Sequence, residues 1–158
     1  CTVVTFAHWQ QGLIVAAGNP KEVRGVEDLA TPEITIVNRP SGSGSRSLLD
    51  RLLQQRNIPA MEVAGYRQEV GGHLAVASAV ASGLVNAGVG VQSAASTMGL
   101  GFVPLEEEQY DLVIPNHFLN QPEMQVLLDI LKSPALHRGI EALGGYDVSP
   151  MGNVVSQS

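Results

Sequence analysis

The sequence predicts a mixed α/β fold with a largely parallel sheet, and three observations support this prediction. Short runs rich in Val, Ile and Thr alternate along the chain with segments that have the apolar spacing of amphipathic helices. The chain has 158 residues, enough for one domain with a substantial core. Its composition is 44% hydrophobic but only 4% aromatic, so that core must consist mainly of Val, Leu, Ile and Ala.

The first third of the chain contains three strand-like runs, each bounded by turn residues. We expect these strands at residues 2–7, 12–16 and 34–37. Residues 23–30 have the pattern of a short helix or turn. Leu48, Leu49, Leu52 and Leu53 recur with helical spacing, which predicts an amphipathic helix over residues 45–56.

The remaining two thirds continue the alternation of helices and strands. We expect helices at residues 73–82, 93–99, 121–132 and 133–143, and strands at residues 58–66, 86–91, 101–105 and 110–115. The glycines in the strand at residues 86–91 permit close backbone packing. An acidic turn at residues 106–108 is predicted to separate the last two strands, and the tail from Gly152 onward is predicted to fray.

Composition also limits the partners of this chain. The formal net charge is −6, which argues against direct binding to nucleic acid but not against a small anion. The most apolar stretch, residues 74–91, contains Ser, Asn and several glycines, so we expect a buried helix and strand there and no membrane partner. No signal peptide is visible, which favours a cytoplasmic over a periplasmic location. The chain begins at Cys1 and not at Met, so we expect it to be part of a longer protein.

The most informative stretch is "NRPSGSGSRSLLD", residues 38–50. Its segment from Arg39 to Arg46 contains two glycines, three serines and two arginines, and it lies between a predicted strand and a predicted helix. A helix N-terminus has unpaired N–H groups and partial positive charge, and glycine lets an anion approach that backbone closely. This pattern predicts an oxyanion site at Gly42, Ser43, Gly44 and Ser45. The alternative is a polar turn with a serine N-cap.

Other known chemistry fits this sequence less well. "GSGSRS" lacks the Gly-Lys-Ser/Thr ending of a P-loop and the third glycine of a dinucleotide-binding motif. It does not match the nucleophile elbow of hydrolases. The four histidines are dispersed, and no pair of them has the spacing of metal ligands. We therefore expect no enzyme activity, no metal and no cofactor.

Several segments, in the same order, resemble a known family. "NRPSGSGSRSLLDRLL" is similar to the "NRQ-x-GSGTR-x-LLD" motif of the periplasmic-binding-protein-like domain associated with molybdate and molybdopterin proteins. Residues 7–30, "HLAVASAVASGLVNAGVGVQSAAS" at residues 73–96, "GFVPLEEEQYDLVIP" and "IEALGGYDVSPMGNV" are similar to its other segments. The resemblance covers nearly the whole chain.

The resemblance implies a type II periplasmic-binding-protein fold, in which two α/β lobes are joined by hinge strands and ligand binds between them. The chain would then hold mainly one Rossmann-like lobe, residues 19–103, as the second lobe. Residues 1–18 and 104–150 would supply the hinge strands and the remainder of the first lobe, including C-terminal helices that return to it. Most of the first lobe would be missing.

By position, the resemblance makes Gly42, Ser43, Gly44, Ser45 and Arg46 ligand contacts. Arg46 either points to the anion or pairs with Asp50 four residues later.

A second group of candidates lies elsewhere in the sequence. The chain departs from the family at "EVGGH", where the N–H groups near Gly72 replace a side-chain donor. His73 either bonds the ligand or caps a helix. Tyr146 either closes over the ligand or packs against the hinge.

The implied function is binding of a small oxyanion, such as molybdate, tungstate, sulfate or phosphate, or of a molybdopterin-like molecule, by a sensor or receptor module. A DNA-binding domain fused to or associated with the parent protein is an implied partner. The alternative function is a ligand-free effector or interaction domain, for which a homodimer is expected because a truncated lobe exposes apolar surface.

Overall fold

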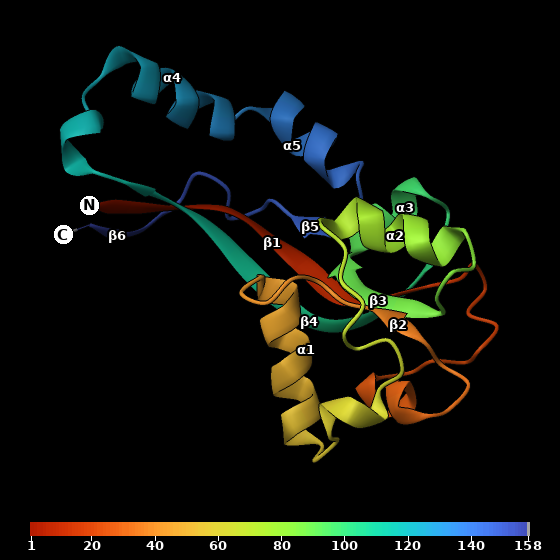
Figure 1. Ribbon diagram of the computed structural model, residues 1–158. Coiled ribbons are helices and arrows are strands. Elements are labelled where there is room, and N and C mark those ends of the chain that lie inside the picture. Colours follow the sequence, from red (N-terminus) through yellow and green to blue (C-terminus); the bar gives the residue numbers. More distant parts are fainter. Residues whose placement is uncertain (158) are drawn as a thin grey trace. The chain divides into compact units, whose positions relative to one another are not determined.

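The computed structural model describes residues 1–157 and has a mixed α/β fold, as predicted (Figure 1). It divides into two compact units. Unit 1 consists of Cys1–Gln10 and Glu107–Ser158, and unit 2 consists of Gln11–Glu106. Strands β1 (Thr2–Val15) and β4 (Gly101–Ile114) each contribute residues to both units.

The sheet in unit 2 has the strand order β2-β3-β1-β4. Strand β2 (Ile36–Val37) is parallel to β3 (Ala87–Val91), and β3 is antiparallel to β1, with Gln11 opposite Val91 and Val15 opposite Ala87. Fewer strand pairs are parallel than we predicted, because the long strand β1 lies inside the sheet and runs against β3.

Successive residues of β3 point to opposite faces of the sheet, and a helical layer of unit 2 packs on each face. Ala87 and Val89 contribute to the same core as Leu49 of α1 (Gly44–Gln55), together with η1 (Val26–Ala30). Gly88 faces α2 (His73–Ala81), since a Cβ added there would lie 2.5 Å from Val76 Cγ1. Helix α3 (Gln92–Thr97) contacts α2. The absence of side chains at the glycines of β3 therefore lets α2 approach the sheet backbone, as the sequence predicted.

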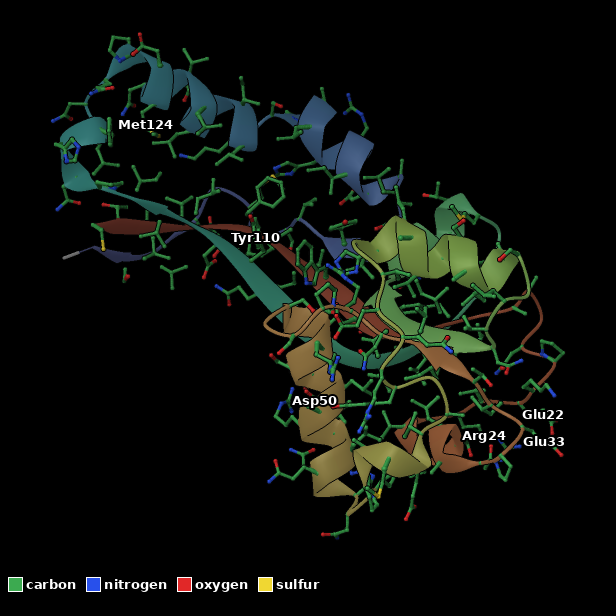
Figure 2. All side chains as sticks on the ribbon, in the orientation of Figure 1. Glu22, Arg24, Glu33, Asp50, Tyr110 and Met124 are labelled. Carbon is green, nitrogen blue, oxygen red and sulfur yellow. The ribbon has the colours of Figure 1, made fainter. Side chains whose placement is uncertain are left out.

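Unit 1 is built on the first half of β1. Strands β5 (Tyr146–Asp147) and β6 (Val154–Gln157) both pair with it in the antiparallel sense. The helical elements are η3 (Asn116–Phe118), α4 (Pro122–Leu131) and α5 (Pro134–Glu141). The fully or nearly buried core residues are Val4, Ala7, Ile114, Leu131, Val148 and Met151. Tyr110 of β4 and Met124 of α4 are labelled in Figure 2.

Two predicted strand breaks do not exist. Residues 2–7 and 12–16 belong to one strand, β1, and residues 101–105 and 110–115 belong to one strand, β4. The predicted acidic turn is wrong because the carboxylates have partners within their own units. Glu107 accepts a hydrogen bond from Gln10 Nε2 at 3.2 Å and contacts His8, while Glu106 pairs with Arg51.

Two further expectations need correction. Residues 58–66 contain the short helix η2 (Ala60–Glu62) and no strand. The tail from Gly152 does not fray throughout, because β6 pairs with β1 through Thr2 opposite Gln157. Within residues 1–157, no helix combines the length and apolar character needed to cross a membrane.

Candidate anion-binding site

Two loops of unit 2 come together just beyond strand β2. Asn38 forms an isolated parallel bridge with Glu69, its N–H donates to the Gln68 carbonyl at 2.7 Å, and its carbonyl accepts from Val70 N–H at 3.0 Å. The first loop leads into α1 and the second leads into α2. The N-termini of both helices therefore start close to the same paired segment (Figure 1).

The N-terminus of α1 has the geometry that the glycine-serine pattern predicts. Ser43 is the N-cap, and its hydroxyl accepts a hydrogen bond from Arg46 N–H at 3.3 Å. Gly42 has φ +91°, and no atom lies within 4 Å of a Cβ placed there, so the backbone faces open space. The N–H groups of Gly44 and Ser45 lie in the first turn, before intrahelical bonding begins. The serine cap and the open backbone thus occur together.

The side chain of Ser45 is bonded inside the protein and does not face solvent. It is buried, with 2% of its surface exposed, and its hydroxyl donates to Gln11 Oε1 of β1 at 2.6 Å. This bond ties the start of α1 to the sheet. Ser45 can offer a ligand only its backbone N–H, and its predicted side-chain role has no geometric support.

Arg46 is held by groups of its own unit. Its Nε lies 3.1 Å from Asp50 Oδ1, and its Nη1 lies 3.2 Å from both Glu69 Oε1 and the Arg39 carbonyl oxygen. Its guanidinium carbon lies 4.3 Å from the centroid of the Tyr66 ring, and the side chain is 13% exposed. Of the two alternatives left open by the sequence, the structure shows the pairing with Asp50, which Figure 2 labels on α1.

The contacts among Arg46, Asp50 and Tyr66 shift the pKa of two of these side chains. The pKa of the Tyr66 phenol is raised, first by burial and then by the hydrogen bond that it donates to Asp50. Burial alone would lower the pKa of Arg46, but its contacts with Tyr66 and Asp50 outweigh burial and raise that pKa. The cluster therefore stabilises a charged guanidinium beside a neutral phenol.

The N-terminus of α2 has no side-chain cap. Its N-cap is Gly72, with φ +93°, and no atom lies within 4 Å of a Cβ placed there. His73 is the first residue of the helix, and its Nδ1 lies 3.2 Å from Arg39 Nη1. His73 lies over Gly90 of β3, because a Cβ placed there would lie 3.6 Å from Nδ1, in ordinary van der Waals contact.

Arg39 is the residue that the sequence analysis did not single out. Its Nη1 contacts His73, and its Nε is buried without a hydrogen-bond partner. Among the residues described, no carboxylate lies within ion-pair distance of Arg39, whereas Arg46 has two. The signal was present in "NRPSGSGSR", where two arginines flank the loop, but spacing alone does not tell which arginine has acidic partners.

Tyr146 lies in unit 1, not in the unit that contains the two loops. Its ring makes a T-shaped contact with Trp9 at a centroid distance of 6.0 Å, and Trp9 stacks on Tyr110 at 5.1 Å. Tyr146 also contributes to the core of unit 1. Its contact with a ligand stays a prediction.

Other hollows found in the structure lie away from Arg39, Gly42 and His73, and one of about 420 Å³ is lined in part by the side chains of Lys21, Asp28 and Glu33. A groove of about 670 Å³ lies along residues 59–68 of unit 2, but its lining does not include Arg39, Gly42 or His73 and is mostly apolar. Across residues 1–157, His, Cys, Asp and Glu side chains do not gather in any group of three or more that could hold a metal ion. The loops before α1 and α2 are therefore the best candidate for binding a small polar ligand.

Comparison with known proteins gives a family match. The family described as "PBP superfamily domain" matches residues 1–132. An uncharacterised Bacillus subtilis protein, YvgK, is 38% identical over 147 residues, which is 93% of this chain and 47% of YvgK. An uncharacterised Clostridium pasteurianum protein encoded in the 5′ region of a 2Fe-2S ferredoxin gene is 37% identical over 111 residues, covering 70% of this chain and 98% of that protein. The chain thus spans about half the length of YvgK.

Solved structures share the fold at low identity. A domain described as the substrate-binding domain of a molybdenum ABC transporter from Clostridium difficile has a TM-score of 0.68 and 17% identity, covering 92% of this chain and 66% of that one. A structure described as a phosphate ABC transporter substrate-binding protein with bound phosphate, from Clostridium perfringens, has a TM-score of 0.61 and 15% identity, covering 89% and 69%.

A third neighbour binds ligands of a different charge. The arginine-, lysine- and histidine-binding protein ArtJ from Geobacillus stearothermophilus has a TM-score of 0.59 and 14% identity, and the match covers 92% of this chain and 62% of that one. These three neighbours are binding proteins of the type II periplasmic-binding-protein fold. Because they differ in ligand, the fold does not identify the ligand of this chain.

Proposed function

This chain belongs to the PBP superfamily domain family, and from that premise we propose that unit 2 binds a small oxyanion at the loops before α1 and α2. The observation that carries this proposal is Arg39. Its guanidinium contacts His73 at the start of α2 and has no carboxylate partner within residues 1–157. A cation placed beside two helix N-termini favours an anion over a neutral or cationic ligand.

The donors available suit a compact tetrahedral anion. The N–H groups of Gly44 and Ser45, the Ser43 hydroxyl, the N–H groups that begin α2 and the Arg39 guanidinium can all donate hydrogen bonds. Molybdate, tungstate, sulfate and phosphate are acceptors that match such a set. An amino acid would also need a carboxylate for its ammonium group, but the nearby Asp50 and Glu69 already pair with Arg46.

The test is thermal unfolding of the chain with molybdate, tungstate, sulfate, phosphate or chloride at matched ionic strength. A ligand at a hundred times its dissociation constant stabilises the folded state by about 2.7 kcal/mol, which raises the melting temperature by several degrees. We expect a shift with at least one oxyanion and none with chloride. Arg39→Met should abolish this shift, while Arg56→Met, an exposed arginine paired with Glu27, should retain it. Equal shifts for all salts would contradict the proposal.

In this proposal the domain acts as a sensor or receptor module. A molybdenum-related ligand and a DNA-binding partner remain predictions from the family resemblance. The cytoplasmic location also remains a prediction.

A second candidate function is an interaction domain, and the surface of unit 1 favours it. Helix α4 exposes Val126, Leu127 and Ile130, with exposed fractions of 57%, 40% and 48%. Such a face is typical of contact with another protein surface, including a second copy of this chain. Sedimentation velocity across a range of concentrations tests self-association, and a monomer at all concentrations would contradict a homodimer.

A further inference from the structure

The two arginines of the loop before α1 differ in their partners, although they are close in sequence. Arg46 contacts two carboxylates and a phenol ring, so its charge is already compensated inside unit 2. Arg39 contacts His73 Nδ1, and because a guanidinium has only donors, this nitrogen must be the acceptor. An imidazole that accepts through Nδ1 holds its proton on Nε2 and adds no charge of its own to the contact. It holds the guanidinium of Arg39 in place without compensating its charge.

Arg46 also connects the two loops. Its Nη1 bonds the Arg39 carbonyl oxygen in the loop before α1 and Glu69 Oε1 in the loop before α2, each at 3.2 Å. Its Nε is held at 3.1 Å by Asp50 on α1, and Asp50 in turn accepts the hydrogen bond from Tyr66. A planar guanidinium can bond several acceptors at fixed angles while stacking on an aromatic ring, and an ammonium cannot.

We propose that Arg46 is a positioning residue that fixes the spacing of the two loops, and that Arg39 is the residue that contacts the anion and determines specificity for its charge. This inference rests on the proposed function for Arg39, but the role of Arg46 is independent of any ligand. It departs from the sequence resemblance, which included Arg46 among the ligand contacts while leaving open its pairing with Asp50. The buried Nε of Arg39, which has no partner, is the donor that a ligand or an associated water would satisfy.

The first arm of the test measures amide hydrogen exchange of the ligand-free chain. Arg46→Lys keeps the charge but cannot span the same acceptors, so exchange should rise about tenfold or more in both residues 39–46 and residues 69–75. Arg39→Lys, whose ammonium can still donate to His73, should change exchange in both segments less than Arg46→Lys does. The control Arg56→Lys, at the other end of α1, should leave both segments unchanged. Faster exchange in one loop alone, or in neither, would overturn the positioning role of Arg46.

The second arm measures binding of sulfate and of nitrate by calorimetry, with molybdate as a third probe. Arg39→Met should weaken sulfate binding about tenfold to a hundredfold and reduce the ratio of sulfate to nitrate affinity. Arg46→Lys should weaken both anions by a similar factor and leave that ratio unchanged. A ratio that depends on Arg46 and not on Arg39 would overturn the assignment.

The two arms of the test distinguish failure of the proposed function from failure of the positioning role of Arg46. If the wild-type chain binds none of these anions, the proposed function and the role of Arg39 both fail. The exchange data then still decide whether Arg46 couples the loops. If anions bind but exchange in the Arg46→Lys variant matches the wild type, the proposed function stands and the positioning role fails.

Discussion

Units 1 and 2 differ in how they bury their apolar side chains. Unit 2 buries a continuous cluster around Leu13, Ile36, Leu49 and Val89. Two of its glycines, Gly12 and Gly65, lie where an added Cβ would overlap a backbone carbonyl oxygen. Unit 1 also has a core, but α4 presents apolar residues to solvent on its second face. Close backbone contacts therefore limit which substitutions unit 2 can tolerate, whereas part of the surface of unit 1 is suited to contact with a partner.

The largest expected effect concerns a close backbone contact in unit 2. Gly65 has φ +86°, and a Cβ there would overlap the Ile36 carbonyl oxygen. Gly65→Ala should therefore lower the free energy of unfolding by about 2 to 6 kcal/mol, from backbone strain plus overpacking. Urea denaturation measures it. Gly83→Ala, where φ is +74° but no atom lies within 4 Å, should cost about 1 kcal/mol. Equal costs at both positions would show that close contact does not limit unit 2.

A smaller effect is expected for the buried hydrogen bond between Ser45 and Gln11. Ser45→Ala should lower the free energy of unfolding by about 1 to 3 kcal/mol, because a buried amide oxygen loses its hydroxyl donor. Anion affinity, measured by calorimetry, should change by less than about threefold. Ser43→Ala is the matched control and should cost about 1 kcal/mol through loss of the N-cap. A large loss of affinity with no loss of stability would restore Ser45 as a side-chain ligand.

An alkaline titration should affect unit 2 through Tyr66. Its pKa is raised above the ordinary value of 10.0, so the folded state retains the phenolic proton after the unfolded state has lost it. The stabilisation is complete below pH 10 and is lost as the pH rises through the raised pKa. Denaturation at a series of pH values should show this decline in the wild type and a smaller one in Tyr66→Phe. An identical decline in both would exclude Tyr66 as its source.

The smallest effect on stability is expected at the exposed face of α4. Val126→Ser combined with Ile130→Ser should change the free energy of unfolding by no more than about 0.5 kcal/mol per substitution, apart from a small loss of helix propensity. If the chain self-associates through this face, sedimentation should show weaker association in the double variant. A loss of several kcal/mol would mean that the face supports the core of unit 1.

The sequence was sufficient to predict the elements that depend on local signals. The leucines of α1 lie on one face, Ser43 caps that helix, and the glycines of β3 allow α2 to approach. In β4 the pattern failed, because a run of three glutamates suggests a turn when the chain is considered alone. Its carboxylates are compensated by His8, Gln10 and Arg51, residues far away in the sequence.

At the candidate site, the sequence predicted the helix N-terminus but not the contacts of the side chains around it. Gly42, Ser43 and Gly44 form an accessible helix N-terminus, as expected from local spacing. The partners of Ser45 and Arg46 come from β1 and from the loop before α2, and no local pattern contains that information. Arg39 became a candidate only when the structure showed its contact with His73 and, among residues 1–157, no carboxylate at ion-pair distance.

Strands β1 and β4 have a practical consequence for anyone who wishes to study one unit alone. Each strand crosses the boundary between the units without a break, near Gln10 and Gln11 in β1 and near Glu106 and Glu107 in β4, and the two strands are hydrogen-bonded neighbours. A protease requires an extended, unpaired segment of several residues, and this boundary offers none. Limited digestion should therefore trim loops and ends but not release an intact unit. A protein made of residues 11–106 alone would contain only parts of β1 and β4, because both strands continue beyond this range.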